Sequence, residues 1–153
     1  MDTRVVATLI VILAIIILVA VGLRASTPPT DDEQVGYVAD VLESECGGES
    51  RDGVMGVVEV IKNRMTFTKK TAYEIVTEPH QFTKPHRVAK FGSFSYTQAI
   101  YLVKYPNSFK TSRRFTHFYA HKKCKPWWAD ELVDVKVIGN HTFGRLRDGK
   151  YSK

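Results

Sequence analysis

Glu45 is the side chain whose type and neighbours best suit acid–base chemistry. It ends a segment, residues 33–45, in which apolar residues recur at helical spacing, and Cys46, Gly47 and Gly48 follow it. The negative end of a helix dipole disfavours a carboxylate and so favours the protonated acid, which can protonate a glycosidic oxygen. The two glycines would let a bulky polymer approach the backbone. Taken alone the pattern is not specific, because a glutamate at a helix end is more often a solvated surface residue.

A glycosidase that uses two carboxylates needs the second about 5–9.5 Å from the first. The sequence does not single one out, because the glycine pair interrupts the helix between Glu45 and Glu49. Glu49 could instead form an ion pair with Arg51 or Arg64. The candidates for the second carboxylate are Glu49, Asp52, Asp130, Glu131 and Asp134.

Aromatic and basic residues are interleaved in the segment 113–128. Aromatic faces can stack on sugar rings, and cations can hold the carboxylates of peptide stems. The same aromatics could also build the core of a sheet, so we expect some rings to be buried and at least one tryptophan to line a groove. The aromatic members are Phe115, Phe118, Tyr119, Trp127 and Trp128, and the basic members are Arg113, Arg114, Lys122, Lys123 and Lys125.

A metal site is the alternative chemistry. His117, His121 and Cys124 are spaced like zinc ligands, and Cys46 or Glu45 could complete the set. If the segment around His117 is a strand, however, residues four apart need not lie together as they would on a helix. Such a ligand spacing is also common in sequences that bind no metal.

The charge of the chain is divided between two halves. The 153 residues include 22 Lys and Arg against 16 Asp and Glu, for a net charge of +6. Residues 25–83 carry 5 basic and 11 acidic side chains (5 − 11 = −6), whereas residues 84–153 carry 15 and 4 (15 − 4 = +11). A basic half of this size attracts polyanions such as nucleic acid, anionic lipid or a carboxylate-bearing wall polymer.

An uncharged apolar run occupies residues 5–23. As a helix it would be roughly 28 Å long, close to the hydrocarbon core of a bilayer. We expect an uncleaved signal-anchor with residues 1–4 in the cytoplasm, residues 24–33 as a stalk, and residues 34–153 as one domain on the outer face. Cleavage as a signal peptide, with secretion, is the alternative.

Helices come first in the domain and strands later, which predicts an α+β fold. We expect helices over residues 33–45, after Ser50 or Asp52, over 72–76 and over 95–105, the last with Ile100 and Val103 inward. The second helix should bury Val54, Val57, Val58, Ile61 and Met65. Strands are expected over 115–120, over 132–138 with Val133, Val135 and Val137 alternating, and over 142–146, with a turn at Gly139 and Asn140.

Five ordered segments of the chain resemble the SleB-type cell wall hydrolase family, named for the spore cortex-lytic enzyme. They span residues 35–145, nearly the whole domain, and each is unspecific alone. The segments are residues 41–49 (VLESECGGE), 60–65 (VIKNRM), 78–83 (EPHQFT), 116–120 (THFYA) with Pro126 and Trp128, and 138–143 (IGNHTF) with Arg145.

The resemblance implies a lysozyme-like helical lobe followed by a small antiparallel hairpin region, and cleavage of peptidoglycan glycan strands by a lytic transglycosylase mechanism. Glu45 would be the catalytic acid and base, so no second carboxylate would be needed. We expect no cofactor, no nucleic-acid partner and a monomer. The residues expected to bind substrate or brace the groove are Glu49, Gln81, Phe82, His117, Tyr119, Trp128 and His141.

Two departures from the family pattern concern the cysteines and tryptophans. Cys46 replaces a position that is usually small and unreactive, and in an oxidising compartment it could form a disulfide with Cys124. The stretch that ends in Trp127 and Trp128 is one residue longer than the pattern, so these two compete for one role.

Other functions stay open at this level. They are a muramidase-type hydrolase, a metal-dependent wall amidase, and a tethered peptidoglycan-binding module without activity. A phage lysis enzyme (endolysin) and a bacterial wall-remodelling enzyme fit equally well.

Overall fold

The computed structural model describes residues 12–13, 28–108, 110, 112 and 114–147 of the chain. The chain divides into two units, Met1–Thr30 and Asp31–Lys153, and the second holds every element discussed below. Apart from Ile12 and Leu13, the predicted membrane segment lies outside the described residues. Within the part described, no helix combines the length and hydropathy that a bilayer crossing requires.

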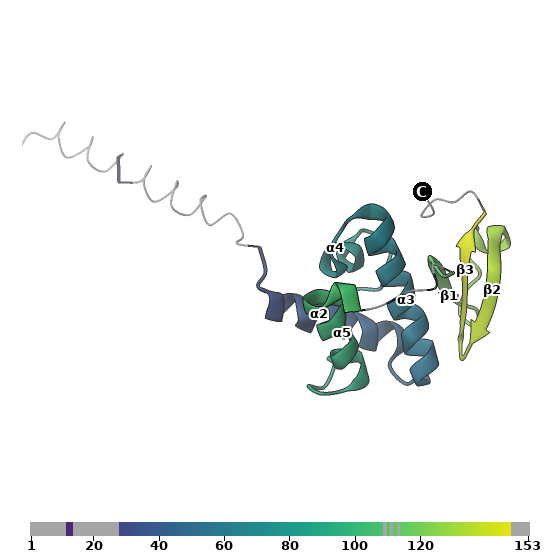
Figure 1. The fold of residues 1–153 in the computed structure, drawn as a ribbon, viewed down its shortest axis with the longest axis horizontal. Coiled ribbons are helices and arrows are strands. Elements are labelled where there is room, and N and C mark those ends of the chain that lie inside the picture. The colour runs from purple at the N-terminus through teal and green to yellow at the C-terminus, as the bar shows by residue number, and fades with distance from the viewer. Residues whose placement is uncertain (1–11, 14–27, 109, 111, 113, 148–153) are drawn as a thin grey trace, which may run out of the picture. The chain divides into compact units, whose positions relative to one another are not determined.

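Four helices form the larger layer of this unit (Figure 1). They are α2 (Asp31–Cys46), α3 (Arg51–Thr68), α4 (Ala72–Thr77) and α5 (Phe94–Lys104), with short 3-10 turns η1 (Pro106–Ser108) and η2 (Ala129–Glu131). Since α2 begins at Asp31, the last three residues of the predicted stalk are helical.

Side-chain caps begin three of these helices. Ser50 accepts a hydrogen bond from the Gly53 amide at the start of α3, and Ser93 accepts one from Tyr96 at the start of α5. Thr71 and Glu74 form a reciprocal capping box on α4, which satisfies amides that a helix start leaves free.

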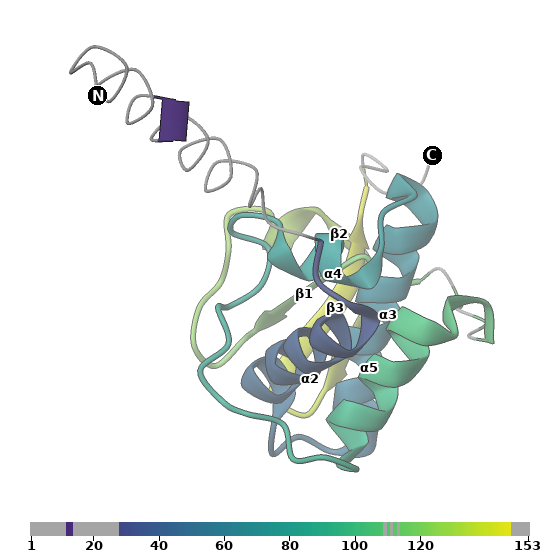
Figure 2. The same ribbon diagram turned by 90° about the vertical axis from the view of Figure 1, so that its left-hand side faces the viewer.

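Three strands form an antiparallel sheet on the side of α3 away from α2 and α5 (Figures 1 and 2). The strands are β1 (His117–Ala120), β2 (Leu132–Ile138) and β3 (His141–Leu146), in the order β1-β3-β2. Gly139 and Asn140 connect β2 to β3, and Gly139 has the positive φ that this turn requires. The α+β prediction is confirmed.

The second helix buries the face that its sequence predicts. Val54, Val57, Val58, Ile61 and Met65 of α3 all belong to the core, together with the inner face of α2.

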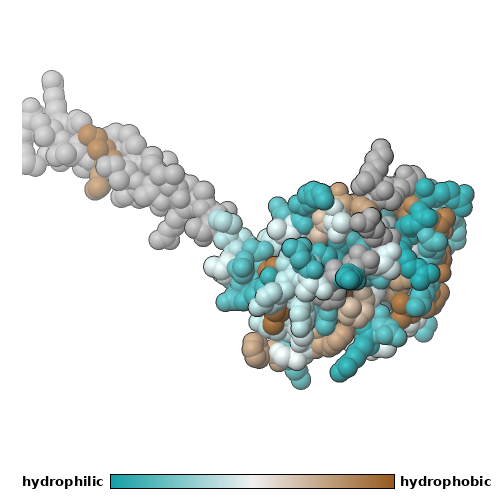
Figure 3. All heavy atoms as spheres, viewed as in Figure 1, coloured by the Kyte–Doolittle hydropathy of each residue, from teal (hydrophilic) through white to brown (hydrophobic). Residues whose placement is uncertain are grey.

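Two predicted faces differ in part from the structure. On α5, Ile100 and Val103 pack against the core as expected but stay partly buried, and the buried residues are Ser95, Gln98, Ala99 and Leu102. On β2 a bulge between Val133 and Lys136, with Asp134 at positive φ, breaks the alternation. Val135 and Val137 therefore face solvent. Hydrophobic residues are accordingly scattered over the exposed surface of the unit among hydrophilic ones (Figure 3).

Close contact between α3 and the sheet depends on Gly56. A Cβ built there would lie 2.6 Å from the Phe143 ring, which is fully buried and packs against Phe115 and Phe118. The missing side chain therefore sets the distance between α3 and β3.

We expect Gly56→Ala to destabilise the domain by about 1–3 kcal/mol, because the added methyl group must displace a packed ring. Gly36→Ala on α2 is the matched control, since a Cβ there meets nothing within 4 Å. It should be neutral or stabilise by about 0.5–1 kcal/mol. Denaturant unfolding of both variants measures the difference, and equal stabilities would contradict the packing described.

Candidate active site

A cleft of about 860 Å³ lies between the helices and the sheet. One wall is the C-terminal end of α2, a second is the loop of residues 80–87, and a third is β1 with the segment that follows it. The hairpin turn at Asn140 and His141 closes the remaining side. Four segments far apart in sequence therefore meet at this cleft.

Most of the predicted site residues line the cleft. The structure brings together Glu45, Glu49, Gln81, Phe82, Tyr119, Trp128 and His141, with Cys46 and Cys124. Of the proposed second carboxylates only Glu49 is among the lining residues. Asp52 lies by another pocket, and Asp130 and Asp134 pair with Lys125 and Arg145.

Glu45 lies in the last turn of α2, as predicted, and its side chain is half-buried. The Thr83 amide donates a hydrogen bond to its Oε1. This contact joins the end of α2 to the loop of residues 80–87 and fixes one oxygen of the carboxylate. The second oxygen has no hydrogen bond among those assigned in the described residues.

The loop that supplies Thr83 is tied to α2 at further points. Ser44 Oγ accepts hydrogen bonds from the His86 and Arg87 amides at 2.9 and 3.0 Å. Asp40 accepts one from the Ala89 amide, and Arg87 donates to the Gly47 carbonyl. These bonds hold the loop along the C-terminal part of α2, so that Thr83 lies at Glu45.

Glu49 is held by the hairpin turn rather than by an arginine. Asn140 donates to it twice, from Nδ2 to Oε1 at 2.7 Å and from the backbone to Oε2 at 3.3 Å. The predicted partners are engaged elsewhere: Arg51 lies over the Phe94 ring, and Arg64 is described below. Burial would raise the pKa of Glu49, but the hydrogen bonds from Asn140, together with the charges of His141 and Lys122, leave the pKa below its ordinary value of 4.5. Glu49 is therefore an anion in the cleft.

His141 is a buried polar residue that directly follows this turn, at the start of β3. Its side chain is 6% exposed and packs against the rings of Phe118 and Phe143. Burial lowers its pKa below the ordinary value of 6.5, although Glu49 and Glu45 act in the opposite direction. The imidazole is therefore neutral near pH 7.

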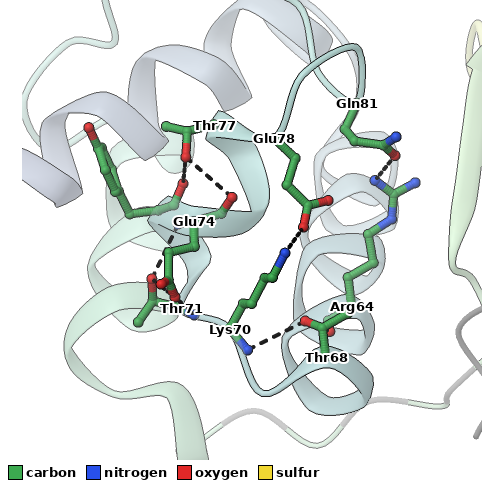
Figure 4. Close-up of polar contacts among 9 residues, drawn as sticks. Arg64, Thr68, Lys70, Thr71, Glu74, Thr77, Glu78 and Gln81 are labelled. Atoms are coloured by element: carbon green, nitrogen blue, oxygen red, sulfur yellow. Dashed lines mark hydrogen bonds and ion pairs between the residues drawn. The ribbon is translucent and has the colours of Figure 1, made fainter.

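Arg64 holds two walls of the cleft in place from α3. Its Nη1 donates to Gln81 Oε1 at 3.0 Å (Figure 4). Its Nε donates to the Thr116 carbonyl at 2.8 Å, and its guanidinium lies over the Phe82 ring. Asn63 beside it donates to the Phe115 carbonyl at 2.7 Å. Neither residue is assigned this role from the sequence alone. The sequence does indicate that Arg64 is on the buried face of the helix, because it follows Ile61 by three positions and Val57 by seven.

The structure separates the roles of the two tryptophans and favours the bracing role for His117. Trp128 lines the cleft and contacts the rings of His117 and Tyr119 edge-on, whereas Trp127 is 85% exposed outside it. His117 does not line the cleft. It is buried behind Trp128, and its Nδ1 is 3.0 Å from Thr116 Oγ1, so it supports Trp128 instead of facing substrate.

The predicted disulfide is not formed, and both cysteines are free. Cys46 is buried on α2, where its thiol donates to the Leu42 carbonyl, whereas Cys124 is exposed. Burial and the nearby glutamates raise the pKa of Cys46 to about 12, which keeps it a thiol.

The zinc alternative has no donor set among the described residues, in which no three His, Cys, Asp or Glu side chains converge to hold a metal ion. His117 is directed at Trp128, and His121 lies 3.2 Å from Thr142 Oγ1.

Comparison with known proteins identifies the class. A sequence model of the family described as Cell Wall Hydrolase matches residues 48–144, more than half of the chain. The chain belongs to this family, and the resemblance to SleB-type enzymes is confirmed. The matched range begins three residues after Glu45.

Two solved structures share the fold. The catalytic domain of the Bacillus cereus SleB protein is 20% identical with a TM-score of 0.56, over 78% of this chain and 94% of that one. The catalytic domain of the germination-specific lytic transglycosylase SleB from Bacillus anthracis is 19% identical with a TM-score of 0.58, over 78% and 98%. Comparison with curated protein sequences gives no match.

The lowered pKa values of His141 and Glu49 predict lower stability in acid. The unfolded chain binds a proton at His141 below pH 6.5 and at Glu49 below pH 4.5, while the folded chain resists both. Each contribution is therefore complete above those values and is lost as the pH falls.

Unfolding free energies measured between about pH 7.5 and 5.5 test the histidine term. His141→Phe should flatten the pH dependence in this window, because it removes the titrating group. Parallel curves for the parent and His141→Phe would contradict the assignment.

Proposed function

We propose that the domain cleaves the glycan strands of peptidoglycan as a lytic transglycosylase. The observation that carries the proposal is the position of Glu45, whose carboxylate faces a large cleft at the end of α2 in a member of the cell wall hydrolase family. The B. anthracis protein of the same fold is described as a lytic transglycosylase, which supports this reaction class.

Glu45 acts first as an acid and then as a base. It donates its proton to the oxygen that links MurNAc to GlcNAc, and the bond from muramic C1 to that oxygen breaks with its electron pair on oxygen. The muramic C6 hydroxyl bonds to C1 and closes a 1,6-anhydro ring. The proton of that hydroxyl returns to the Glu45 carboxylate, so the enzyme ends as it began.

The cleft lining fits an acidic glycan. Phe82, Tyr119 and Trp128 offer aromatic surface for sugar rings, and Arg87, Lys122 and Lys123 offer cations for the carboxylates of peptide stems. This combination favours an extended acidic polymer as the substrate over a small neutral sugar.

A muramidase is the second candidate, and a specific observation favours it. Glu49 shares the cleft with Glu45 and is ionised, as the second carboxylate of a hydrolytic glycosidase must be. In that reaction water takes the place of the C6 hydroxyl, and the product carries a reducing end.

The apolar run of residues 5–23 supports a further part of the proposal, that the chain is anchored in a membrane with this domain on the outer face. Extraction of the full-length chain from membranes by alkaline carbonate would contradict anchoring. Retention in the pellet until detergent is added is the expected result.

Glu45→Gln should abolish glycan cleavage while leaving the fold intact. Gln keeps the size of the side chain but cannot donate and recover a proton, so we expect soluble fragment release from purified sacculi to fall at least about 100-fold. Glu131→Gln, at an exposed glutamate outside the cleft, is the matched control and should digest normally. Digestion that survives Glu45→Gln would show that this carboxylate is not the acid.

The adjacent tryptophans provide a matched pair for substrate binding. Trp128→Ala should weaken binding to sacculi about tenfold, because it removes the largest ring of the cleft's aromatic surface. Trp127→Ala should leave binding unchanged, because Trp127 lies outside the cleft. Co-sedimentation with sacculi measures both, and Trp128→Phe shows whether a lost contact or a lost fold causes the effect. A larger loss at Trp127 would contradict the proposed substrate path.

A further inference from the structure

The segment that connects α4 to α5 contains no helix or strand, although part of it forms one wall of the cleft. Over residues 78–93 the backbone amides therefore have no regular ladder of hydrogen bonds to join. Such groups still need partners, which side chains or water must supply. Side chains of α2 are the partners of several of these amides.

Three side chains in the C-terminal half of α2 accept hydrogen bonds from four amides of this segment. In order along the segment, Thr83 donates to Glu45, His86 and Arg87 donate to Ser44 at 2.9 and 3.0 Å, and Ala89 donates to Asp40 at 2.8 Å. The residue numbers rise along the segment while they fall along α2, so the two run antiparallel in contact.

Ser44 is the acceptor that ties the segment to α2 next to the acid. Its Oγ accepts two amides, which occupies both lone pairs of the hydroxyl oxygen. Thr83 therefore lies between two anchors, because Arg64 holds Gln81 from α3 on its other side. The Ser44 anchor belongs to the helix that bears Glu45, so it fixes the Thr83 amide relative to the acid.

The Thr83 amide makes the two oxygens of the Glu45 carboxyl group different. It donates to Oε1, and no hydrogen bond to Oε2 is assigned within the described part of the chain. An N–H group is accepted best by the carboxyl oxygen that carries no proton. When Glu45 is protonated, this contact therefore favours the proton on Oε2.

We propose that Ser44 is a positioning residue for the acid, because its hold on the loop of residues 80–87 keeps the Thr83 amide on Oε1 and leaves Oε2 to transfer the proton. The inference rests on the proposed glycan cleavage and deepens it. In the reaction, Oε2 gives its proton to the oxygen that leaves muramic C1, and the carboxylate recovers a proton from the attacking hydroxyl. Ser44 exchanges no proton itself.

Three variants of the full-length chain test this role. Ser44→Ala removes the acceptor, and because alanine is the better helix former α2 should remain folded. Ser44→Thr keeps the hydroxyl and is the conservative rescue. Ser93→Ala is the matched control, because it removes a serine hydroxyl that also accepts a backbone amide, from Tyr96, but lies outside the cleft lining.

Two measurements are made on each variant. Hydrogen exchange of the Thr83, His86 and Arg87 amides, followed by NMR, reports the attachment of the loop. Fragment release from purified sacculi gives kcat and KM.

Ser44→Ala should speed exchange at the three amides at least about tenfold, because two hydrogen bonds are lost. Its kcat should fall about tenfold with KM within about threefold, because misplacement of the acid acts on the chemical step. Ser44→Thr should recover most of both losses. Ser93→Ala should match the parent in exchange at these amides and in kcat.

A folded Ser44→Ala variant with the parental kcat overturns this inference, and if Glu45→Gln still abolishes digestion the proposed function stands. A loss of kcat without faster exchange at Thr83, or an equal loss in Ser93→Ala, also overturns it. If Ser44→Ala does not fold, Ser44→Cys decides, since a thiol has a similar size but accepts hydrogen bonds weakly. A parent chain that releases no glycan fragments overturns the proposed function, and this inference with it.

Discussion

The buried guanidinium of Arg64 is the contact on which the architecture of the cleft depends. It is 3% exposed, and a charge in such a place is tolerated only when its donors are satisfied. Its partners lie 17 and 52 residues further along the chain, at Gln81 and Thr116. One side chain of α3 therefore positions both the loop that contacts Glu45 and the start of β1. Removing it would leave two walls of the cleft without their common support.

A second constraint comes from the end of α2 and the hairpin turn. The helix places Glu45, and the turn that follows it places Glu49, which Asn140 holds from 91 residues away. Gly139 has no side chain, which leaves room for the Glu49 carboxylate beside the turn. The two carboxylates therefore line the same cleft but have different surroundings. One accepts a single backbone amide, and the other is anchored as an anion. Different environments for two carboxylates are what a division of roles requires.

The sequence predicted what local rules determine. Apolar periodicity located the helices, Ser50 marked the start of α3, and Gly139 with Asn140 marked the hairpin. The sequence did not predict features that depend on a distant contact or on a local irregularity of the backbone. The bulge at Asp134 turns Val135 and Val137 outward, and the partner of Glu49 is a turn residue that no spacing rule connects to it. The sequence left open whether His117 contacts substrate or braces the groove, and its place behind Trp128 follows from packing that only the folded chain shows.

The proposed function requires that this cleft breaks the glycan strand and not the peptide stem. The decisive measurement is mass spectrometry of the muropeptides that the unmodified full-length chain releases from sacculi. We expect glycan fragments that end in 1,6-anhydro muramic acid, and reducing muramic ends would indicate the hydrolytic variant at the same bond. Free stem peptides with intact glycan strands would contradict the claim, because that product requires an amidase and gives Glu45 no leaving oxygen to protonate.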